Sequence, residues 1–267
     1  MNLQAILAHM EEAAREAGAY LYEGFSQQKT VDHKSSAIDL VTEYDRGAEE
    51  MIVSRLTAVY PHFNLLAEEG SRNRTDSPYT WIIDPLDGTT NFAHGLPHFC
   101  VSIALYEGNT PLAGVVHDPV RDECFTAVSG QGAFLQQGRS KQKLQVSTAE
   151  TLVQSILATG FPYDRHTAAV NNVAQLAAFL KKAQGIRRAG SAALDLAYVA
   201  AGRLDGYWEF KLHPWDVAAA HLMVLEAGGL SSDMMDHPLE IREKIGMVAS
   251  NGRIHRQIIE TLAEINS

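Results

Sequence analysis

Acidic residues gather at three places in the sequence, each at the end of a predicted strand or the start of a predicted helix. They are Glu68 and Glu69 after the apolar run 63–67, Asp84 and Asp87 after the run 79–83, and Asp216 at the start of a long apolar segment. Carboxylates brought together in a cleft repel one another and are costly to desolvate, so a cation is expected between them. Oxygen ligands from separate elements suit a hard cation such as Mg²⁺.

Each cluster also has a simpler interpretation when it is taken alone. An aspartate at a helix start, such as Asp216, is often an N-cap. A glutamate pair after a strand is often a solvated loop. The segment DPLDGTT (84–90) also fits an Asx-type turn that leads into a capped helix. The metal hypothesis therefore depends on the three clusters acting together.

The segment Asp87-Gly88-Thr89-Thr90 adds an anion site to this prediction. If a helix begins at Thr89, its first backbone N–H groups are unpaired and favour an anion. Glycine at position 88 lets a phosphate oxygen approach the backbone without meeting a Cβ. Carboxylates, a cation, an anion-binding helix start and a hydroxyl together indicate metal-assisted hydrolysis of a phosphate ester.

The elements that must position these residues follow from hydrophobic periodicity. Helical spacing predicts amphipathic helices over residues 1–21 and 43–59. Short apolar runs separated by turn signals predict an antiparallel sheet from 63–67, 79–83, 99–106, 112–117 and 123–128. After a polar stretch at 136–147, strands alternate with helices (one at 166–182), which predicts an α/β layer. We therefore expect an N-terminal α+β subdomain over 1–140, with most metal ligands, and a C-terminal α/β subdomain over 141–267, with Asp216 and the substrate contacts.

Composition excludes several classes of protein. The chain has 267 residues, of which 46% are hydrophobic and 20% charged, so a large folded core is expected. The net charge of −10 and the lack of a basic stripe argue against direct nucleic-acid binding. No run approaches the ~18 apolar residues of a membrane span, and the first helix lacks the features of a signal peptide. Two isolated cysteines favour a reducing, cytoplasmic location and disfavour structural zinc.

The motifs together resemble those of the inositol monophosphatase family, and most closely those of its bacterial inositol-1-monophosphatases. The resemblance rests on the segments KSSAIDLVTEYD (34–45), EEG (68–70), DPLDGTTNF (84–92), GSAALDLAYVAAGRLDG (190–206) and PWDVAAAHLMVLEAGG (214–229). It implies the layered α-β-α-β-α sandwich of these sugar phosphatases and a homodimer. It also implies two to three Mg²⁺ ions and sensitivity to lithium.

The same resemblance assigns roles to individual residues. Glu68, Asp84 and the Leu86 carbonyl would hold the first Mg²⁺, and Asp84, Asp87 and Asp216 the second. A third, weaker ion would rest on Glu68 and water. Thr89 would assist the attacking water, with Asp45 as its proton acceptor. Substrate contacts would come from the following residues: Asp87, Gly88, Thr89, Gly190, Ser191, Ala192, Glu209 and Asp216. Glu69 matches a position beside the metals, and Lys34 a loop near them, although a lone lysine is usually solvated.

Other catalytic arrangements are disfavoured. His94, His98 and His213 lie in or near the motifs without metal-type spacing, and we expect them to be hydrogen-bonded wall residues. Ser191 follows Gly190 but lacks the GxSxG pattern of a nucleophile elbow, so a covalent route is not expected.

The sequence therefore predicts a Mg²⁺-dependent phosphomonoesterase for inositol 1-phosphate or a similar small polyol or sugar phosphate. The shared motifs leave open a phosphatase for fructose 1,6-bisphosphate, histidinol phosphate, adenosine 3',5'-bisphosphate or NADP. They also leave open an added role as a protein partner of the transcription machinery.

Overall fold

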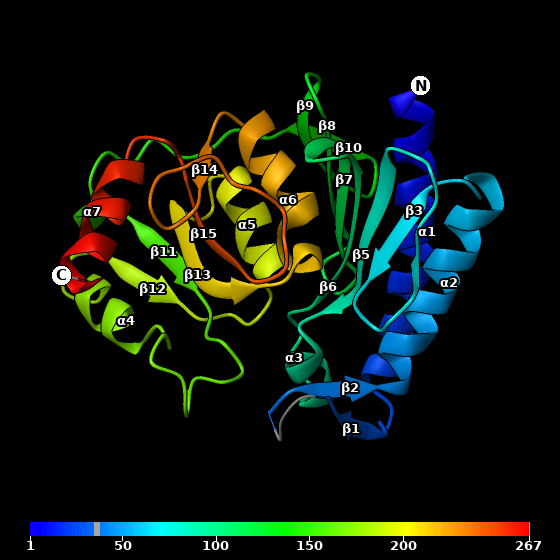
Figure 1. Cartoon of the computed structure of the whole chain (residues 1–267), viewed down its shortest axis with the longest axis horizontal. Coiled ribbons are helices and arrows are strands. Elements are labelled where there is room, and N and C mark those ends of the chain that lie inside the picture. Colours follow the sequence, from blue (N-terminus) through cyan, green and yellow to red (C-terminus); the bar gives the residue numbers. More distant parts are fainter. Residues whose placement is uncertain (35–37, 267) are drawn as a thin grey trace.

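The chain folds into five alternating layers of helix and sheet. Figure 1 shows this computed structural model, which describes residues 1–34 and 38–266, so that 35–37 of the 34–45 motif lie outside the described part. From one side of the molecule to the other, the layers are α1 and α2, an eight-stranded sheet, α5 and α6, a five-stranded sheet, and α4 and α7. The predicted α-β-α-β-α sandwich is confirmed.

The eight-stranded sheet carries the first half of the chain. Its order is β10-β9-β8-β7-β6-β5-β3-β4, and neighbours are antiparallel except for the parallel pair β3 and β5. The bounds are β3 Asn64–Ala67, β4 Arg72–Asn73, β5 Tyr79–Asp87, β6 Cys100–Glu107, β7 Thr110–Asp118, β8 Glu123–Val128, β9 Gly132–Gln137 and β10 Ser140–Lys143. A separate hairpin of β1 (Val31–His33) and β2 (Leu40–Thr42) leads into α2.

Helices α1 (Leu3–Phe25) and α2 (Glu43–Val59) cover the outer face of this sheet. Asn2 and Thr42 cap their first turns by accepting hydrogen bonds from backbone N–H groups. The buried face of α1 recurs at three- and four-residue spacing, which places Met10, Ala14 and Leu21 against the sheet. The bounds of α2 match the predicted helix over 43–59.

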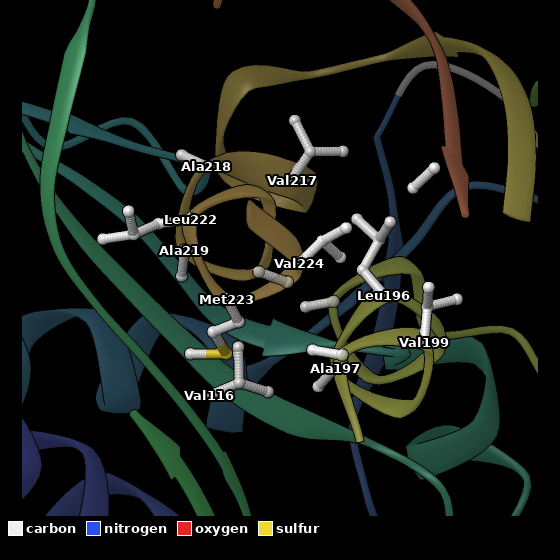
Figure 2. Packing of buried hydrophobic residues seen from close by; sticks show 14 of the residues in the cluster. Val116, Leu196, Ala197, Val199, Val217, Ala218, Ala219, Leu222, Met223 and Val224 are labelled. Carbon is white, nitrogen blue, oxygen red and sulfur yellow. The ribbon is translucent and has the colours of Figure 1, made fainter. Parts of the chain in front are cut away.

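Helices α5 (Ala192–Ala200) and α6 (Pro214–Glu226) form the middle layer between the two sheets. Figure 2 shows their apolar side chains packed against each other and against Val116 of β7. Small residues such as Ala197 and Ala219 let the two helices and the sheet approach closely. Because α6 is apolar nearly all round, its polar N-terminus, with Asp216, is the part left to face a pocket.

The five-stranded sheet has the order β12-β11-β13-β15-β14 and mixes parallel and antiparallel pairs. Its strands are β11 Ile156–Thr159, β12 Gly185–Arg187, β13 Gly206–Leu212, β14 Leu230–Ser232 and β15 Ile245–Ser250. The short helix η1 (Leu152–Gln154) precedes β11, and α4 (Val173–Phe179) and α7 (His255–Asn266) cover the outer face.

Two predicted elements differ from the structure. The helix predicted over 166–182 is only Val173–Phe179, because the buried Asn172 holds a left-handed conformation (φ 69°) and starts the helix late. The polar stretch 136–147, predicted as a subdomain junction, instead contains the end of β9 and all of β10. β10 is an edge strand with every residue exposed, so it lacks the apolar alternation that marks a strand.

The proposed division at residue 140 therefore falls at the first residue of β10, and the chain enters the second sheet only at Ile156. One hydrophobic cluster also joins residues of both sheets through α5 and α6. Two subdomains thus remain a prediction. None of the helices in the described part of the chain is both long and apolar enough to cross a membrane.

Candidate metal and phosphate site

One pocket of about 520 Å³ lies where the ends of β3 and β5 face the starts of α3 (Thr89–Ala93), α5 and α6. The predicted site residues that line it are Glu68, Asp84, Leu86, Asp87, Gly88, Thr89, Gly190, Ser191, Ala192, Glu209 and Asp216. The three acidic clusters, separated by up to 148 positions from Glu68 to Asp216, therefore meet in one pocket.

A bulge in β5 explains how Asp84 and Asp87 share this pocket. Successive side chains of a regular strand alternate between faces, so residues three apart would point to opposite sides. Here Asp84 pairs with Ser102 and Asp87 with Cys100, which leaves two strand residues opposite one. The extra residue restores a common face for the two carboxylates. The strand thus continues to Asp87, beyond its predicted end at 83.

Glu68 reaches the pocket from the turn after β3. Its backbone N–H donates to the carbonyl of Ile83 in β5, at 3.1 Å. Lys34 pairs with Glu68 at 2.9 Å and with Glu69 at 2.5 Å. Burial lowers the pKa of Lys34, but the two glutamates more than offset this, and the net change is upward. Lys34 is therefore paired with this acidic turn, where the sequence had suggested a solvated lysine.

Backbone amides orient the three aspartates. Leu86 N–H donates to Oδ1 of Asp84 at 3.0 Å, and His213 N–H donates to Oδ2 of Asp216 at 2.7 Å. Oδ2 of Asp87 accepts from the Ser191 hydroxyl and the Ala193 N–H, both at 2.7 Å. A carboxylate held through one oxygen is fixed in direction and retains a second oxygen with which to bind a ligand.

These carboxylates are unfavourable as a group of bare anions. Burial, followed by repulsion from Glu68, raises the pKa of Asp84 and that of Asp216 well above their usual range. Burial also raises the pKa of Asp87 to about 6, although its hydrogen bonds from Ser191 and Ala193 oppose the shift. A divalent cation would relieve this repulsion and favour the ionised carboxylates.

The donor set fits a hard cation. Among the lining groups, the side chains of Glu68, Asp84, Asp87 and Asp216 and the Leu86 carbonyl offer oxygen atoms, the ligand type that Mg²⁺ prefers. Among residues 1–34 and 38–266, no three acidic, histidine or cysteine side chains already have the close spacing of a formed metal site. The fit therefore rests on the chemistry, burial and shared pocket of these carboxylates.

Thr89 and Asp45 form a buried hydroxyl–carboxylate pair beside these acids. The Thr89 hydroxyl lies 2.8 Å from Oδ1 of Asp45 and 3.1 Å from the Leu86 carbonyl. Oδ2 of Asp45 accepts from the backbone N–H and the hydroxyl of Thr42, at 2.8 and 2.6 Å. Burial raises the pKa of Asp45, although the bonds from Thr42 and Thr89 partly oppose this. A carboxyl with a raised pKa is a stronger proton acceptor once it is ionised.

Gly88 places the start of α3 against the pocket. Its φ of 101° lies in the region that favours glycine, and an added Cβ would come within 3.0 Å of the His98 carbonyl oxygen. The first N–H groups of a helix have no partner within it, so those at Gly88 and Thr89 are available to an anion. Because α3 has only five residues, local N–H groups matter more here than a helix dipole.

The wall on the side of the second sheet carries the remaining predicted substrate contacts. Ser191 caps α5 by accepting from Leu194 N–H, and it donates to Asp87, so its hydroxyl is already engaged with protein groups. Glu209 accepts from the Tyr207 hydroxyl at 2.5 Å, and its carboxylate rests against Gly160, where any Cβ would collide with it. Burial raises the pKa of Glu209 to about 7.

Several residues of this wall were missed by sequence reasoning. Asp195 on α5 is 3% exposed and lines the pocket, and burial followed by repulsion from Glu209 raises its pKa well above the usual range. Arg165 and Arg188 also line the pocket. A single acid on an apolar helix, a lone arginine and a pair of adjacent arginines give no spacing signal, so only the fold reveals them.

Two of the three histidines lie in the pocket wall as expected, but the prediction of a hydrogen-bonded wall residue is wrong for His98. His94 and His213 line it, and His213 stacks on Trp215 with an interplanar angle of 5°. His98 is not among the lining residues described, and its Nε2 is buried without a hydrogen-bond partner in the described part of the chain.

Comparison with known proteins shows similarity over the whole chain. The model of the inositol monophosphatase family matches residues 2–267. An inositol-1-monophosphatase from a Synechocystis species is 43% identical over 98% of this chain and 90% of its own. A Nus factor SuhB from Pseudomonas aeruginosa is 44% identical over 97% of this chain and 96% of its own. The solved inositol monophosphatase from an Anabaena (Nostoc) species superposes with a TM-score of 0.87 at 39% identity, covering 99% of this chain and 97% of that one.

Proposed function

Because the chain belongs to the inositol monophosphatase family, we propose that it is a Mg²⁺-dependent phosphomonoesterase that hydrolyses inositol 1-phosphate or a similar small polyol or sugar phosphate. One observation carries the proposal. Four carboxylates, from the turn after β3, from β5 and from α6, line the same pocket as a threonine hydroxyl that is hydrogen-bonded to a buried aspartate. Family membership supports a phosphatase, and this geometry supports its dependence on a divalent cation.

The residues of the pocket would bind the metal ions and the phosphate group. Glu68, Asp84 and the Leu86 carbonyl would hold one Mg²⁺, and Asp84, Asp87 and Asp216 a second, with a third, weaker ion at Glu68. When bound, Mg²⁺ activates water and neutralises charge on the phosphate. The N–H groups at Gly88 and Thr89 would bind the phosphate oxygens.

Proton movement would pass through the Thr89 hydroxyl. Thr89 donates to Oδ1 of Asp45, which leaves its oxygen lone pairs free to accept a proton from the attacking water. Glu209 would accept a hydrogen bond from a hydroxyl of the leaving alcohol. The net reaction cleaves the ester P–O bond, and water supplies the oxygen to phosphate and the proton to the alcohol.

Phosphate release from a panel of substrates tests this function. The panel should contain inositol 1-phosphate, glycerol 2-phosphate, histidinol phosphate, fructose 1,6-bisphosphate, adenosine 3',5'-bisphosphate and NADP, each with Mg²⁺ and with a chelator. We expect inositol 1-phosphate among the best substrates and no turnover in the chelator. A clear preference for another ester would make that ester the proposed substrate in place of inositol 1-phosphate. No turnover of any ester with any divalent metal would overturn the enzyme proposal.

The SuhB-named relatives favour one further role, that of a protein partner of the transcription machinery. Binding to a purified bacterial RNA polymerase elongation complex tests it, with Asp84→Asn as a site-disrupted control. Retained binding by this variant would separate the partner role from catalysis, and no binding by either protein would exclude the role.

We also expect a homodimer, which light scattering measures directly.

A further inference from the structure

Glu49 is a buried carboxylate on α2 that does not line the pocket. It is 4% exposed and lies one helical turn after Asp45. Oε2 accepts from the backbone N–H of Glu69 at 2.7 Å, and Oε1 accepts from the N–H of Ser71 at 2.9 Å. Hydrogen bonds from backbone amides to a carboxylate are among the stronger ones in proteins, so these two bonds hold the turn firmly to α2.

The two amides belong to the turn that presents Glu68. This turn joins β3 to β4 and passes through Gly70, with φ 114°. At its base, Ala67 N–H donates to the Ser71 carbonyl at 3.1 Å, and Glu68 N–H donates to Ile83 at 3.1 Å. Glu68 is thus held by β5 at its own N–H and, through the next residue, by Glu49 of α2.

Helix α2 therefore contacts two of the segments that form the pocket. Asp45 and Glu49 are four residues apart, and this spacing places both carboxylates on one face of the helix. Asp45 contacts Thr89 at the start of α3, and Glu49 contacts the turn after β3. The relative placement of Glu68 and Thr89 is thus set by one rigid element.

We propose that Glu49 is a positioning residue for Glu68: by clamping the Glu69 and Ser71 amides, it sets the affinity of the pocket for its first divalent cation. This inference rests on the proposed Mg²⁺ dependence. Partners that orient a ligating side chain typically change metal affinity by about 10- to 100-fold when they are removed. The competing explanation is that Glu49 only caps a turn and stabilises the fold.

Glu226 offers a matched control within the same chain. It lies at the end of α6, and its two oxygens accept from the N–H groups of Gly130 and Gly132, both at 2.7 Å. This turn joins β8 to β9, and neither glycine lines the pocket. Glu226→Gln and Glu49→Gln therefore make the same chemical change to the same kind of turn clamp, one of them beside Glu68 and one away from it.

The test is calorimetric titration of each purified protein with Mg²⁺ alone, together with a thermal melt in chelator. We expect both variants to lose stability, but only Glu49→Gln to bind Mg²⁺ about tenfold or more weakly. Wild-type Mg²⁺ affinity in a folded Glu49→Gln protein would overturn the inference and leave Glu49 as a turn cap. Absence of Mg²⁺ binding by the wild-type protein would instead count against the proposed function.

A second measurement needs no variant and covers the case in which Glu49→Gln does not fold. Coupling between two binding events is reciprocal, so a clamp that strengthens Mg²⁺ binding must itself be strengthened by Mg²⁺. We expect hydrogen exchange at the Glu69 and Ser71 amides to slow when Mg²⁺ is added, while the Gly130 and Gly132 amides stay unchanged. Unchanged exchange at all four amides, in protein that binds Mg²⁺, would also overturn the inference.

Discussion

Asp45 makes two kinds of contact in the structure, and these suggest a structural and a chemical task. Oδ2 completes the capping of α2 with Thr42, and Oδ1 meets the Thr89 hydroxyl. An N-cap contact is worth about 1 kcal/mol of stability, whereas general-base assistance is worth about 10²–10⁴ in rate. The two tasks therefore predict effects on different measurements when Asp45 is changed.

The first prediction concerns the Asp45–Thr89 pair. Asp45→Asn and Thr89→Ala should each lower kcat about 10²–10⁴-fold at saturating Mg²⁺, because each breaks the same proton path. The double variant should be little worse than either single one, since residues that act as a unit are not additive. Steady-state kinetics of the three variants measure this. Fully additive losses would show that the residues act separately, and a wild-type kcat for Asp45→Asn would leave Thr89 a helix-start residue only.

The second prediction separates the two proposed metal positions. Asp84 is 2% exposed and is assigned to both ions, whereas Asp216 is assigned to one. Asp84→Asn should therefore abolish or weaken the binding of both the first and the second Mg²⁺, and Asp216→Asn should mainly weaken the binding of the second. Calorimetric titration resolves the steps. Unchanged Mg²⁺ binding by Asp84→Asn would rule out its bridging role.

At the scale of elements, the end of β5 and the start of α3 form one unit. The bulge between Asp84 and Asp87 turns both acids to the pocket, and Gly88 then reverses the backbone into α3. Gly88 meets two demands at once, a positive φ and a close approach to the His98 carbonyl. The positive φ and the close approach together fix the position of the Gly88 and Thr89 N–H groups, which would bind phosphate.

The third prediction compares Gly88→Ala with Gly95→Ala. Gly95 has φ 74° and open space around its missing Cβ, whereas a Cβ at Gly88 would lie 3.0 Å from the His98 oxygen. An alanine at positive φ costs on the order of 1 kcal/mol of folding free energy, so Gly95→Ala should lose about that much. Gly88→Ala should lose more and should also weaken inhibition by inorganic phosphate. Equal phosphate inhibition in both variants would remove Gly88 from the phosphate site.

The elements differ in how far the sequence could predict them. Helix α2 was predicted with its observed bounds because its apolar residues recur at helical spacing and Pro61 follows its last turn, and the Thr42 cap found in the structure agrees with that start. The β5 bulge was not predicted, since an extra residue in a strand leaves no mark on composition. Helix α4 was predicted too long because Asn172 is held by tertiary hydrogen bonds to Thr159 and Trp208, which periodicity does not record.

The site shows the same limit. The acidic clusters could be recognised in the sequence because paired acids at strand ends are unusual. The pairing of Thr89 with Asp45 joins residues 44 positions apart, and only the family resemblance suggested it before the structure placed the two atoms 2.8 Å apart. Asp195 and Glu49 were missed, because a single acid within a helix reads as a solvated residue unless the packing around it is known.

At the scale of the whole molecule, a net charge of −10 is combined with a buried group of acids. Burial raises the pKa of Asp87 to about 6 and that of Glu69 and Glu209 to about 7, above their usual 3.8 and 4.5. A carboxyl with a raised folded-state pKa stabilises the fold at low pH, and this contribution is lost as pH rises through that pKa. Metal-free protein should therefore lose stability as the pH rises through about 6–7.

Buried histidines act in the opposite direction, but in a lower pH window. Burial lowers the pKa of His117 and of His221 to about 4, from 6.5. These histidines lower the free energy of unfolding as pH falls from about 6.5 toward 4, because they bind protons in the unfolded chain but stay neutral in the folded protein. Above pH 6.5 they are mostly neutral in both states. The carboxyls therefore dominate between about pH 6.5 and 8.

The fourth prediction follows from this window. In chelator, thermal melts should show a more stable protein at pH 6.5 than at pH 8, and Glu209→Gln should reduce that difference by about 1 kcal/mol, since it removes one titrating group. Stabilisation by added Mg²⁺ should be larger at pH 8, because protons and the cation compete for the same carboxylates. Metal-free protein that is more stable at pH 8 would mean that these acids are already ionised without a cation. Repulsion between these acids would then give no reason to expect a bound cation.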